Sequence, residues 1–488
     1  MLPNVALWGR RIAHAEPDAG RSNSGPIALK LQSPYNQATY FEREGTVRTL
    51  PVLWIAFGLS AAEPSYFRDV RPVLQRQCQG CHQPNLKSSH LDLATYEGLK
   101  AGGTRGPALG LLVKYLTGEM KPQMPLGLPP LPPEQIELIR NWVAAGGNDD
   151  TPEEARETVS AGTPTIYFQP PVLTALAFSP DGKMLAVSGN REILLHTLDG
   201  SASPRRLPGL SDTVLSLAFS RDGSLLVAGG GTPARFGEIQ IWDLPAARLR
   251  RSVMLTGDTV FGVSISQDGS RVAAGCTDNT VRIVDTASGK EVGKMGAHEN
   301  WVLGTVFGVD GKRVVSVGRD RSAKLTDAAS GAFQENLNLL RGELAAVARH
   351  PSKDMVVVGG EDRIAYVYLM DRPKNMKIAD DTTMIRKLER QNGVIAALAW
   401  SPDGGRIAVA GAAPEVNVYD AGTGARVTAC TGHTAGIYSV AFSPDSATLA
   451  TGGFDGTVRL YDAATGALKK AFVPVPLEKS ASESGGLR

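Results

Sequence analysis

The sequence predicts a multidomain protein in which a small all-α domain is followed by an all-β propeller with seven blades. Three observations support this fold class. A Cys-x-x-Cys-His motif lies between two stretches with helical spacing of apolar residues, an acidic stretch follows, and a short phrase, usually containing Asp-Gly, then returns seven times. Repeats of about 42 residues with hairpin turns and alternating apolar strands are typical of four-stranded propeller blades.

The composition of the 488-residue chain is that of a globular protein. Its 42% hydrophobic and 20% charged residues can form packed cores. The 51 Lys and Arg nearly balance the 49 Asp and Glu, so bulk charge does not support nucleic-acid binding or attachment to a membrane surface. The 54 Gly indicate many tight turns, and the four Cys are too few for a disulfide-stapled scaffold.

An apolar run at Leu50–Ala62 (LPVLWIAFGLSAA) has the features of a secretory signal. It follows Arg48 and ends in the small residues that signal peptidase accepts. It is shorter than the roughly 18 to 20 apolar residues that span a bilayer. We therefore expect a periplasmic or otherwise extracytoplasmic protein without a membrane span.

The position of this run, well inside the chain, is unusual for a signal. We expect Val47 to be the true initiator, so that residues 1–46 are an extension upstream of the start, residues 47–62 are the signal and Glu63 begins the mature protein. The alternatives are a buried strand or short helix in a genuine N-terminal region, and an uncleaved anchor.

The motif Cys78-Gln79-Gly80-Cys81-His82 has the spacing of covalent c-type haem attachment. Thiols at positions i and i+3 lie on one side of a helical turn, so both can form thioethers with the two vinyl groups while the adjacent imidazole faces the iron. A zinc site would need a second ligand pair, for which His90 is the one close candidate, and a thioredoxin-like pair would need a βαβ surround. We expect one covalent haem c, held by Cys78 and Cys81, with His82 on the iron.

Helices are expected on both sides of this motif, over Tyr66–Gln77 and Pro133–Ala145, because apolar residues recur there at helical spacing. The sixth iron ligand should come from the Pro-rich segment before the second helix. A thioether there stabilises Fe(II) and suits electron transfer. Met124 is preferred because the stiff run PLGLPPLPP follows it, and Met120 is the runner-up. Either side chain could instead simply fill the core.

The runs DVRPVLQRQCQGCH, LDLATYEGLKAGG and PQMPLG, with the helix that ends IRNWVAAGG, resemble the planctomycete-type cytochrome c domain. The resemblance covers residues 66–147. It implies a single haem with His82 and a Met, here Met124, as axial ligands.

The repeated phrase occurs as FSPDG at Phe178, FSRDG at Phe219, ISQDG at Ile265, FGVDG at Phe307, RHPSKD at Arg349, WSPDG at Trp400 and FSPDS at Phe442. Successive copies are 41 to 51 residues apart. Tails such as IWD and LYD resemble the WD-repeat signature, although the fifth repeat is degenerate and Trp242 alone keeps the Trp. Either GALKKAFVPV or Thr165–Phe168 could supply the strand that closes the ring.

Two His and Asp pairs, His298 with Asp320 and His433 with Asp455, share a spacing of 22 residues. A catalytic pair is one interpretation, but two copies at one spacing favour a hydrogen-bonded brace inside each repeat. Cys276 and Cys430 lie in strand-like runs of different repeats, which favours buried free thiols over a disulfide.

The expected domains are residues 1–62, the extension and signal; residues 66–147, a cytochrome c-like haem domain; residues 148–163, an acidic linker; residues 164–475, a seven-bladed WD-repeat propeller; and residues 476–488, a polar tail. A partner protein should bind the rim that carries the turns between second and third strands. The expected rim residues are Arg235 and Phe236 in an enlarged loop, Trp301, Arg319, Arg321, Arg363 and Phe454.

We therefore expect an exported single-haem cytochrome that transfers one electron at a time and is tethered to a protein-binding propeller. Its partners would be a redox donor or acceptor protein and a protein on the propeller rim, either an acidic protein or the chain's own cytochrome domain. One alternative is a haem-dependent scaffold or sensor with little electron flux. Another is a propeller oxidoreductase that uses the haem as electron acceptor, which would need a second cofactor or substrate site in the channel.

Overall fold

The structure is a computed structural model that describes residues 63–83, 88–151, 165–296, 298–339, 341–371 and 381–478. The predicted extension and signal, most of the acidic linker and the end of the polar tail lie outside these residues. In the described part of the chain, none of the helices has the length and apolar character needed to cross a membrane.

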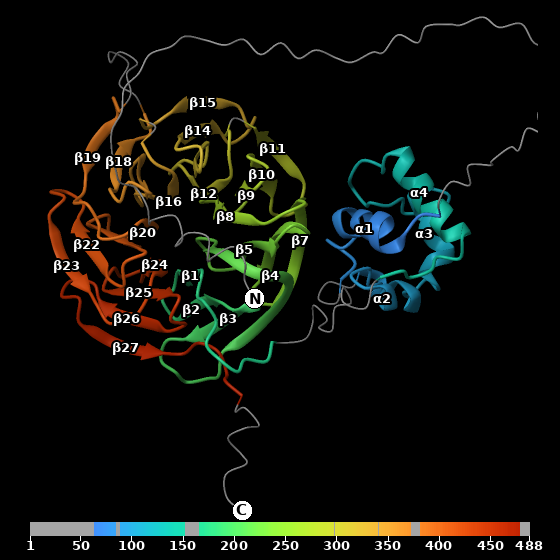
Figure 1. Ribbon diagram of the computed structural model, residues 1–488, viewed down its shortest axis with the longest axis horizontal. Helices are drawn as coiled ribbons and strands as arrows, with labels where there is room; N and C mark the ends of the chain where they lie inside the picture. The colour runs from blue at the N-terminus through green and yellow to red at the C-terminus, as the bar shows by residue number, and fades with distance from the viewer. Residues whose placement is uncertain are drawn as a thin grey trace, which may run out of the picture. The chain divides into compact units, whose positions relative to one another are not determined.

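Residues 63–151, which we call the helical segment, contain short helices joined by coil (Figure 1). These are the π-helical turn η2 (Tyr66–Val70), α1 (Arg71–Gln77), the 3-10 turn η3 (Ser88–His90), α2 (Tyr96–Ala101), α3 (Ala108–Thr117) and α4 (Pro133–Ala144). Side-chain caps begin two of them: the hydroxyls of Ser65 and Thr95 each accept a backbone N–H, at 3.0 Å. Gly118, in the left-handed conformation, ends α3.

The helical segment has its own apolar core. Val70, Leu74 and Ile139 are fully buried in it. The ring of Tyr66 stacks on that of Trp142, with centroids 5.4 Å apart, and this contact joins the start of the segment to its last helix. The apolar positions with helical spacing therefore do face a core, as the sequence predicts.

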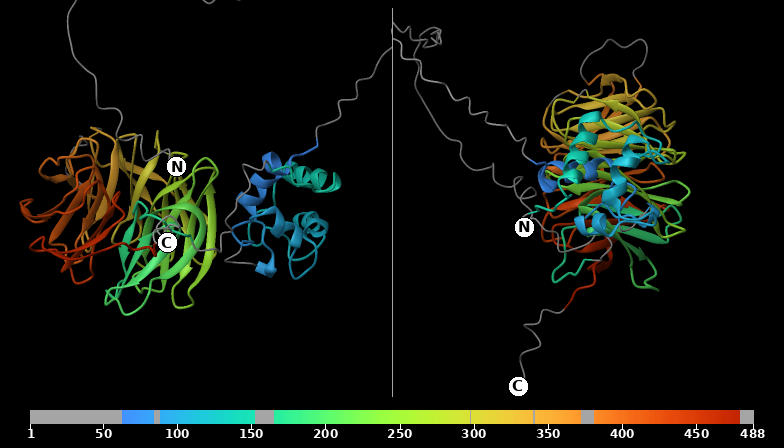
Figure 2. Two further views of the ribbon diagram at one scale, coloured as in Figure 1. Left: turned by 60° about the horizontal axis from the view of Figure 1, so that its bottom comes forward. Right: turned by 90° about the vertical axis from the view of Figure 1, so that its right-hand side faces the viewer.

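The rest of the described chain forms antiparallel sheets arranged around a ring, which Figures 1 and 2 show from different directions. The first sheet contains β1 (Leu176–Phe178), β2 (Met184–Ser188), β3 (Asn190–Thr197), β4 (Arg205–Phe219), β5 (Leu225–Thr232), β6 (Phe236–Asp243) and β7 (Arg248–Thr256). The second contains β8 (Val260–Ile265), β9 (Arg271–Cys276), β10 (Val281–Asp285) and β11 (Glu291–Met295).

Four further sheets of four strands complete the ring. They are β12 (Val302–Phe307) with β13 (Arg313–Gly318), β14 (Ala323–Asp327) and β15 (Phe333–Asn336); β16 (Leu344–Arg349) with β17 (Met355–Gly360), β18 (Tyr366–Leu369) and β19 (Met384–Lys387); β20 (Ile395–Trp400) with β21 (Arg406–Gly411), β22 (Val416–Asp420) and β23 (Arg426–Cys430); and β24 (Ile437–Phe442) with β25 (Thr448–Gly453), β26 (Val458–Asp462) and β27 (Leu468–Phe472).

The repeated phrase forms the turn between the first and second strands of each repeat. In the first copy the hydroxyl of Ser179 donates to Asp181 Oδ1 at 2.6 Å and accepts the N–H of Met184 at 2.9 Å. Gly182 adopts a φ of +70°, which glycine reaches without steric cost. The Ser, Asp and Gly of the phrase thus each stabilise the turn, and this explains why they recur.

The predicted fold class is wrong in two respects. Instead of a small all-α cytochrome c-like domain, the described helical segment has four short α-helices, of six to twelve residues, within a chain that is mostly β. The many prolines between α3 and α4 keep that stretch non-helical, because proline cannot donate a backbone hydrogen bond. Instead of one propeller of seven four-stranded blades, the strands form six separate sheets.

Strand β4 is the reason that seven repeats give six sheets. Its first residues, from Arg205 to Pro208, pair with β3, and its last, from Thr213 to Phe219, pair with β5. The chain stays extended between these two stretches, so the outer strand of the first repeat becomes the inner strand of the second. The backbone N–H and hydroxyl of Ser211 in this join both donate to Glu238 Oε1 on β6, at 3.1 and 2.6 Å.

The ring closes between the last sheet and the first. The run GALKKAFVPV supplies β27, the outer strand of the last sheet, whereas Tyr167 forms only an isolated parallel bridge with Leu477. Between the two sheets, Leu173 and Leu176 pack with Ala450 and Val458 in one apolar cluster. Side-chain packing, rather than a shared strand, therefore closes the ring.

Candidate functional site

The Cys-x-x-Cys-His motif forms a tight turn at the end of α1. The N–H of Cys78 donates to Leu74 O at 2.9 Å, and the N–H groups of Cys81 and His82 both donate to Cys78 O, at 3.2 and 3.1 Å. Cys78 packs against the core of the helical segment, Cys81 is exposed and His82 is buried. The structure thus brings two thiols and one imidazole together within five residues, and neither thiol is in a disulfide.

The two thiols of the motif are neutral near pH 7. Burial raises the pKa of Cys78 to about 12, and the pKa of Cys81 is also raised because its thiol is partly desolvated although the residue as a whole is exposed. In redox-active Cys-x-x-Cys pairs the attacking thiol has a lowered pKa instead. The environment of this pair therefore does not favour disulfide exchange.

The imidazole of His82 is oriented by the loop that follows it. Its Nδ1 lies 3.0 Å from the carbonyl oxygen of Ser88. Burial lowers the pKa of His82, so the neutral ring is favoured. A carbonyl can only accept a hydrogen bond, so Nδ1 must carry the proton and Nε2 keeps its lone pair, as in a metal-bound histidine.

The two candidate methionines follow α3. The N–H of Met124 donates to Tyr115 O, and that of Met120 donates to Lys114 O, both at 3.0 Å. Both side chains are half-buried. Met124 packs against the same core as Cys78, and this shared core favours Met124 as the residue near the motif.

These residues fit a covalently bound haem. Within the motif, Oε1 of Gln79 is buried and has no hydrogen-bond partner among the described residues. The same holds for the side-chain amide atoms of Gln83, which follows the motif, so both side chains could still bind a polar group. A zinc site fits less well, because no three His, Cys, Asp or Glu side chains gather as a metal site in the part of the chain that the structure describes. His90, the candidate fourth zinc ligand, is exposed.

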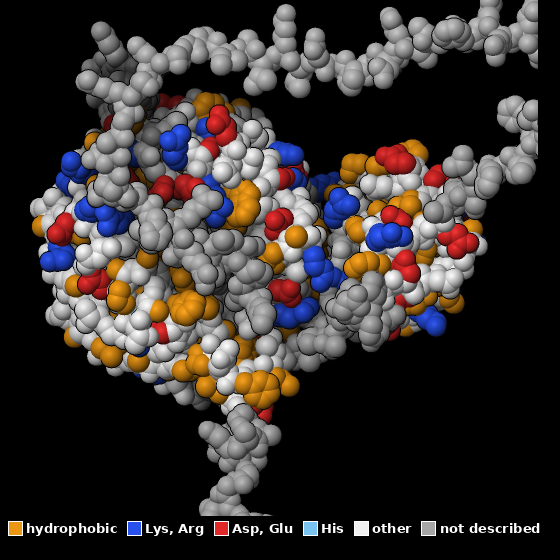
Figure 3. All heavy atoms as spheres, in the orientation of Figure 1, with side chains coloured by type: hydrophobic (Ala, Val, Ile, Leu, Met, Phe, Trp, Pro, Cys, Tyr) orange, Lys and Arg blue, Asp and Glu red, His pale blue; other side chains and the backbone are white. Residues whose placement is uncertain are grey.

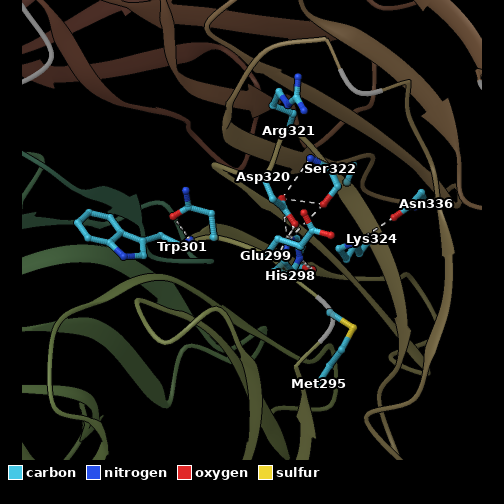
Figure 4. A network of polar contacts seen from close by, with 12 residues as sticks. Met295, His298, Glu299, Trp301, Asp320, Arg321, Ser322, Lys324 and Asn336 are labelled. Atoms are coloured by element: carbon cyan, nitrogen blue, oxygen red, sulfur yellow. Dashed lines mark hydrogen bonds and ion pairs between the residues drawn. The ribbon is translucent and has the colours of Figure 1, made fainter. Parts of the chain in front are cut away.

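The predicted brace of His298 and Asp320 is confirmed (Figure 4). His298 Nδ1 lies 2.9 Å from Asp320 Oδ2, and Nε2 lies 2.7 Å from the hydroxyl of Ser316. The order Ser, His, Asp is that of a hydrolytic triad, but Ser316 is 0% exposed and His298 only 4%, so a substrate could not reach the hydroxyl. The three side chains join β13 to the turn that follows it and to the segment before β12.

The second brace has the same geometry. His433 Nδ1 lies 3.0 Å from Asp455 Oδ2, and Nε2 lies 2.7 Å from Thr451 Oγ1. In the first brace, burial alone would raise the pKa of Asp320, but the hydrogen bonds from His298, Ser322 and the backbone of Glu299, together with the charge of His298, outweigh burial and lower it to about 2. Cys276 and Cys430 are buried free thiols, as predicted.

The predicted rim residues differ in their accessibility. Arg235, Arg321 and Phe454 are exposed, and Arg363 is half-buried. Phe236 is only 5% exposed, and it packs with Leu210 of β4 and Met254 of β7. Arg235 lies in the turn before β6, whereas Phe236 is the first residue of the strand, and the sequence alone did not indicate where the turn ends.

Two predicted rim residues, Trp301 and Arg319, stack with each other and with Phe261, which was not predicted from the sequence. The Arg319 guanidinium lies 4.2 Å from the centre of the Trp301 ring, and Trp301 stacks on Phe261 at 5.5 Å. Trp301 extends away from the His298 brace (Figure 4). Phe261 was missed, although it and Trp301 both lie at the beginning of an inner strand, β8 and β12.

Acidic and basic side chains are intermixed over the face of the ring that Figure 3 shows. Arg319, for example, has the Glu343 carboxylate 3.8 Å away. The charges on this face of the ring are therefore mixed in sign, without a large surface field of one sign.

Comparison with known proteins identifies the repeats. The family model described as "WD domain, G-beta repeat" matches residues 201–232, 250–285, 289–327 and 424–462. The curated protein "Transcription factor unc-37" of Caenorhabditis elegans is 29% identical over 168 residues, which cover 34% of this chain and 26% of that protein. The match thus spans about a quarter of that relative. WD40 repeats are thus found in four stretches of the chain, and the antiparallel sheets that contain these stretches resemble those of a WD-repeat propeller.

Proposed function

We propose that this chain is an extracytoplasmic electron carrier, in which the helical segment holds one covalent haem c and the WD-repeat ring binds a partner protein. The observation that carries the proposal is the turn at residues 78–82. It presents two free thiols three residues apart and a buried imidazole whose Nδ1 is held by the carbonyl of Ser88. This set of donors is what thioether attachment and axial ligation require.

The residues of the candidate site have separate roles in this proposal. Cys78 and Cys81 would hold the haem through thioether bonds, and His82 and Met124 would be the axial ligands. The carbonyl of Ser88 keeps the proton of His82 on Nδ1 and so aims Nε2. When bound, haem c supplies reversible one-electron exchange between Fe(III) and Fe(II). The apolar core behind Cys78 and Met124 excludes water and would favour the reduced state.

An extracytoplasmic location follows from the same chemistry. Bacterial c-type haem is attached outside the cytoplasm, and the apolar run at Leu50–Ala62 has the composition of an export signal. We therefore propose that the chain is exported before it receives haem.

The test is to express the full chain with a c-type maturation system and to measure its haem by the pyridine haemochrome spectrum. We expect about one haem per chain, which acidified acetone does not extract. The Cys78→Ala, Cys81→Ala double variant should lose its covalent haem. The matched control, Cys276→Ala with Cys430→Ala, removes two buried thiols of the ring and should keep it. A wild-type chain that matures without haem would contradict the proposal.

A further inference from the structure

The fifth copy of the repeated phrase differs from most others at the residue that holds the turn together. Five copies have Ser there, for example Ser179, whereas the fifth has His350. His350 is 5% exposed and lies in the turn between β16 and β17. Its Nδ1 accepts the backbone N–H of Ser352 at 3.1 Å and that of Lys353 at 3.0 Å. An imidazole nitrogen is thus the side-chain acceptor inside this turn.

These two hydrogen bonds define the protonation state of the ring. A ring nitrogen accepts a hydrogen bond only through its lone pair, so Nδ1 of His350 carries no proton and the neutral ring has its proton on Nε2. A proton on Nδ1 would remove both hydrogen bonds at once and leave two backbone N–H groups facing a third donor. The hydrogen bonds that close the turn at residues 349–354 therefore require a neutral imidazole.

The charged groups around the ring oppose its protonation. Arg349 Nη1 donates to the carbonyl oxygens of the two residues that follow it, both at 3.0 Å, which keeps a guanidinium beside the turn. Burial lowers the pKa of His350 below its ordinary value of 6.5, and the charges of Lys353 and Arg349 lower it further. Asp354, at the end of the turn, is paired with Arg313 of β13 at 2.9 Å. An imidazolium here would therefore join two cations.

The same ring contacts the turn of the sixth repeat. Its centre lies 4.8 Å from that of the ring of Trp400, the one Trp at the first position of the phrase, in an edge-to-face arrangement. Gly404 makes room for the imidazole, because a Cβ there would lie 2.7 Å from His350 Nε2. Asp403, the carboxylate before Gly404, accepts the Ser401 hydroxyl within its own turn at 2.5 Å. The imidazole therefore joins the fifth turn to the sixth.

The turns that contain Ser use acceptors that do not titrate near neutral pH. Asp181 Oδ1, for example, accepts the N–H of Lys183 at 3.0 Å. The pKa of each such aspartate lies below its ordinary value of 3.8, mainly because the Ser hydroxyl donates to it. These aspartates are Asp181, Asp222, Asp268, Asp403 and Asp445. Mild acid leaves these carboxylates ionised, whereas it can protonate an imidazole.

We propose that His350 is an acid-sensitive switch built into the ring. Protonation of its Nδ1 opens the turn at residues 349–354 and loosens the contact with Trp400, while the turns that contain Ser stay closed. The fifth and sixth repeats are then held together less firmly at the end of the strands that carries these turns. The inference concerns the ring alone and does not depend on the proposed haem.

Hydrogen–deuterium exchange of the full chain, measured by mass spectrometry from about pH 7.5 to about pH 5, tests the switch. The turn should be closed above pH 6.5 and should open as the pH falls through the lowered pKa of His350. After correction for the intrinsic exchange rate, protection of the N–H groups of Ser352 and Lys353 should fall at least about tenfold over this range. The turn that contains Asp181 should keep its protection in the same samples.

The variant His350→Asn separates the acceptor from its titration. The Asn side-chain oxygen can accept the same N–H groups, but it does not bind a proton in this pH range. Protection in the fifth turn should therefore become independent of pH. The control is His196→Asn, which replaces a half-buried histidine of β3 and should keep the wild-type pH dependence of the fifth turn.

Exchange of the C2 proton of His350 in the wild-type chain measures its pKa without any variant. A value at or above 6.5 would overturn the switch, because the folded turn would then not favour the neutral ring. The proposal is also wrong if protection in the fifth turn stays constant while His350 titrates, or if His350→Asn remains pH-dependent. Loss of protection in all the turns together would show that the chain unfolds as a whole, which likewise contradicts a local switch. The two wild-type measurements decide the question even if His350→Asn does not fold.

Discussion

At the scale of single residues, the candidate site depends on which atom of each side chain is already engaged. His82 differs from the buried His298 in this respect. His298 uses both ring nitrogens on side chains, Asp320 and Ser316, whereas His82 hydrogen-bonds to the backbone of its own loop, at Ser88 and Leu91. A histidine held by two side chains is a structural residue, whereas one oriented by backbone carbonyls can be a metal ligand.

The choice between the two methionines gives a prediction at this scale. Met124→Ala should abolish the weak far-red sulfur-to-iron band and lower the reduction potential, because a thioether ligand stabilises Fe(II). Met120→Ala is the matched control and should change neither. Optical spectra and redox titration of the two variants measure both effects. A Met120→Ala variant that loses the band would show that the ligand is Met120, and two unchanged variants would favour the sensor alternative.

The Asp320 brace predicts a dependence of stability on pH. The pKa of Asp320 in the folded chain is about 2, below its ordinary value of 3.8, so folding favours the ionised carboxylate. This contribution is present above about pH 4 and is lost as the pH falls toward 2. Asp320→Asn should therefore lower the free energy of unfolding by about 1–3 kcal/mol at pH 6.

Urea unfolding of wild type and Asp320→Asn between pH 6 and pH 2 checks this prediction. The difference between the two proteins should shrink with acidification, since the wild-type carboxylate becomes protonated. A difference that stays constant with pH would mean that the charge on Asp320 does not stabilise the fold.

At the scale of elements, turns and short loops carry the surface chemistry of the ring. Arg321 occupies the turn between β13 and β14 with a φ of +67°, and Arg363 occupies the equivalent turn of the next repeat with a φ of +65°. The last repeat has Gly456 at this position, with a φ of +66°. A left-handed φ is disfavoured for arginine and free for glycine, so the arginines keep a charged side chain on the rim at some cost in stability.

The rim prediction follows from these turns. Arg235→Glu with Arg321→Glu should slow the association of an acidic partner, most strongly at low salt, because rim charges act mainly on the association rate. The partner would be a protein that co-purifies with the wild-type chain from its host, and surface plasmon resonance at several salt concentrations measures the rate. The control is Lys183→Glu with Lys312→Glu, because both lysines lie in turns at the other end of the strands. Equal association rates for the two double variants would exclude this rim as the interface.

At the scale of the whole molecule, the ring depends on the contact between its first and last sheets. Leu173 is fully buried there among residues of both sheets. At other junctions the neighbouring sheets follow each other directly along the chain, whereas here they come from opposite ends of the repeat region. A weakened contact can therefore open the ring only at this junction.

This gives a stability prediction. Leu173→Ala should lower the free energy of unfolding by about 2–4 kcal/mol. It should also reduce the cooperativity of urea unfolding, because the ends of the repeat array can separate before the rest unfolds. Leu325→Ala removes an equally buried leucine between two interior sheets. We expect Leu325→Ala to lower the free energy of unfolding by a similar amount, but to leave the slope of that free energy against urea concentration as in the wild type. If the free energy of unfolding falls with urea concentration at the same slope in both variants, packing at Leu173 does not close the ring.

The sequence alone was sufficient for features that depend on local chemistry. The Ser-x-Asp-Gly turns form because their hydrogen bonds join residues at most five apart, as between Ser179 and Met184. The brace of His298 with Asp320 was predictable from its repetition at one spacing, and the turn at Cys78–His82 from the spacing of its two Cys and its His. These patterns determine the repeats, the braces and the donor set of the candidate site.

Only the tertiary structure decided which neighbours these local units meet. The number of sheets depends on whether the chain between Pro208 and Thr213 bends or stays extended, and contacts with Glu238 on another strand hold it extended. The burial of Phe236 and the stacking of Phe261 on Trp301 depend likewise on residues far away in the chain. Local hydrogen bonds are fixed by spacing along the chain, whereas packing depends on which distant surfaces the fold brings together.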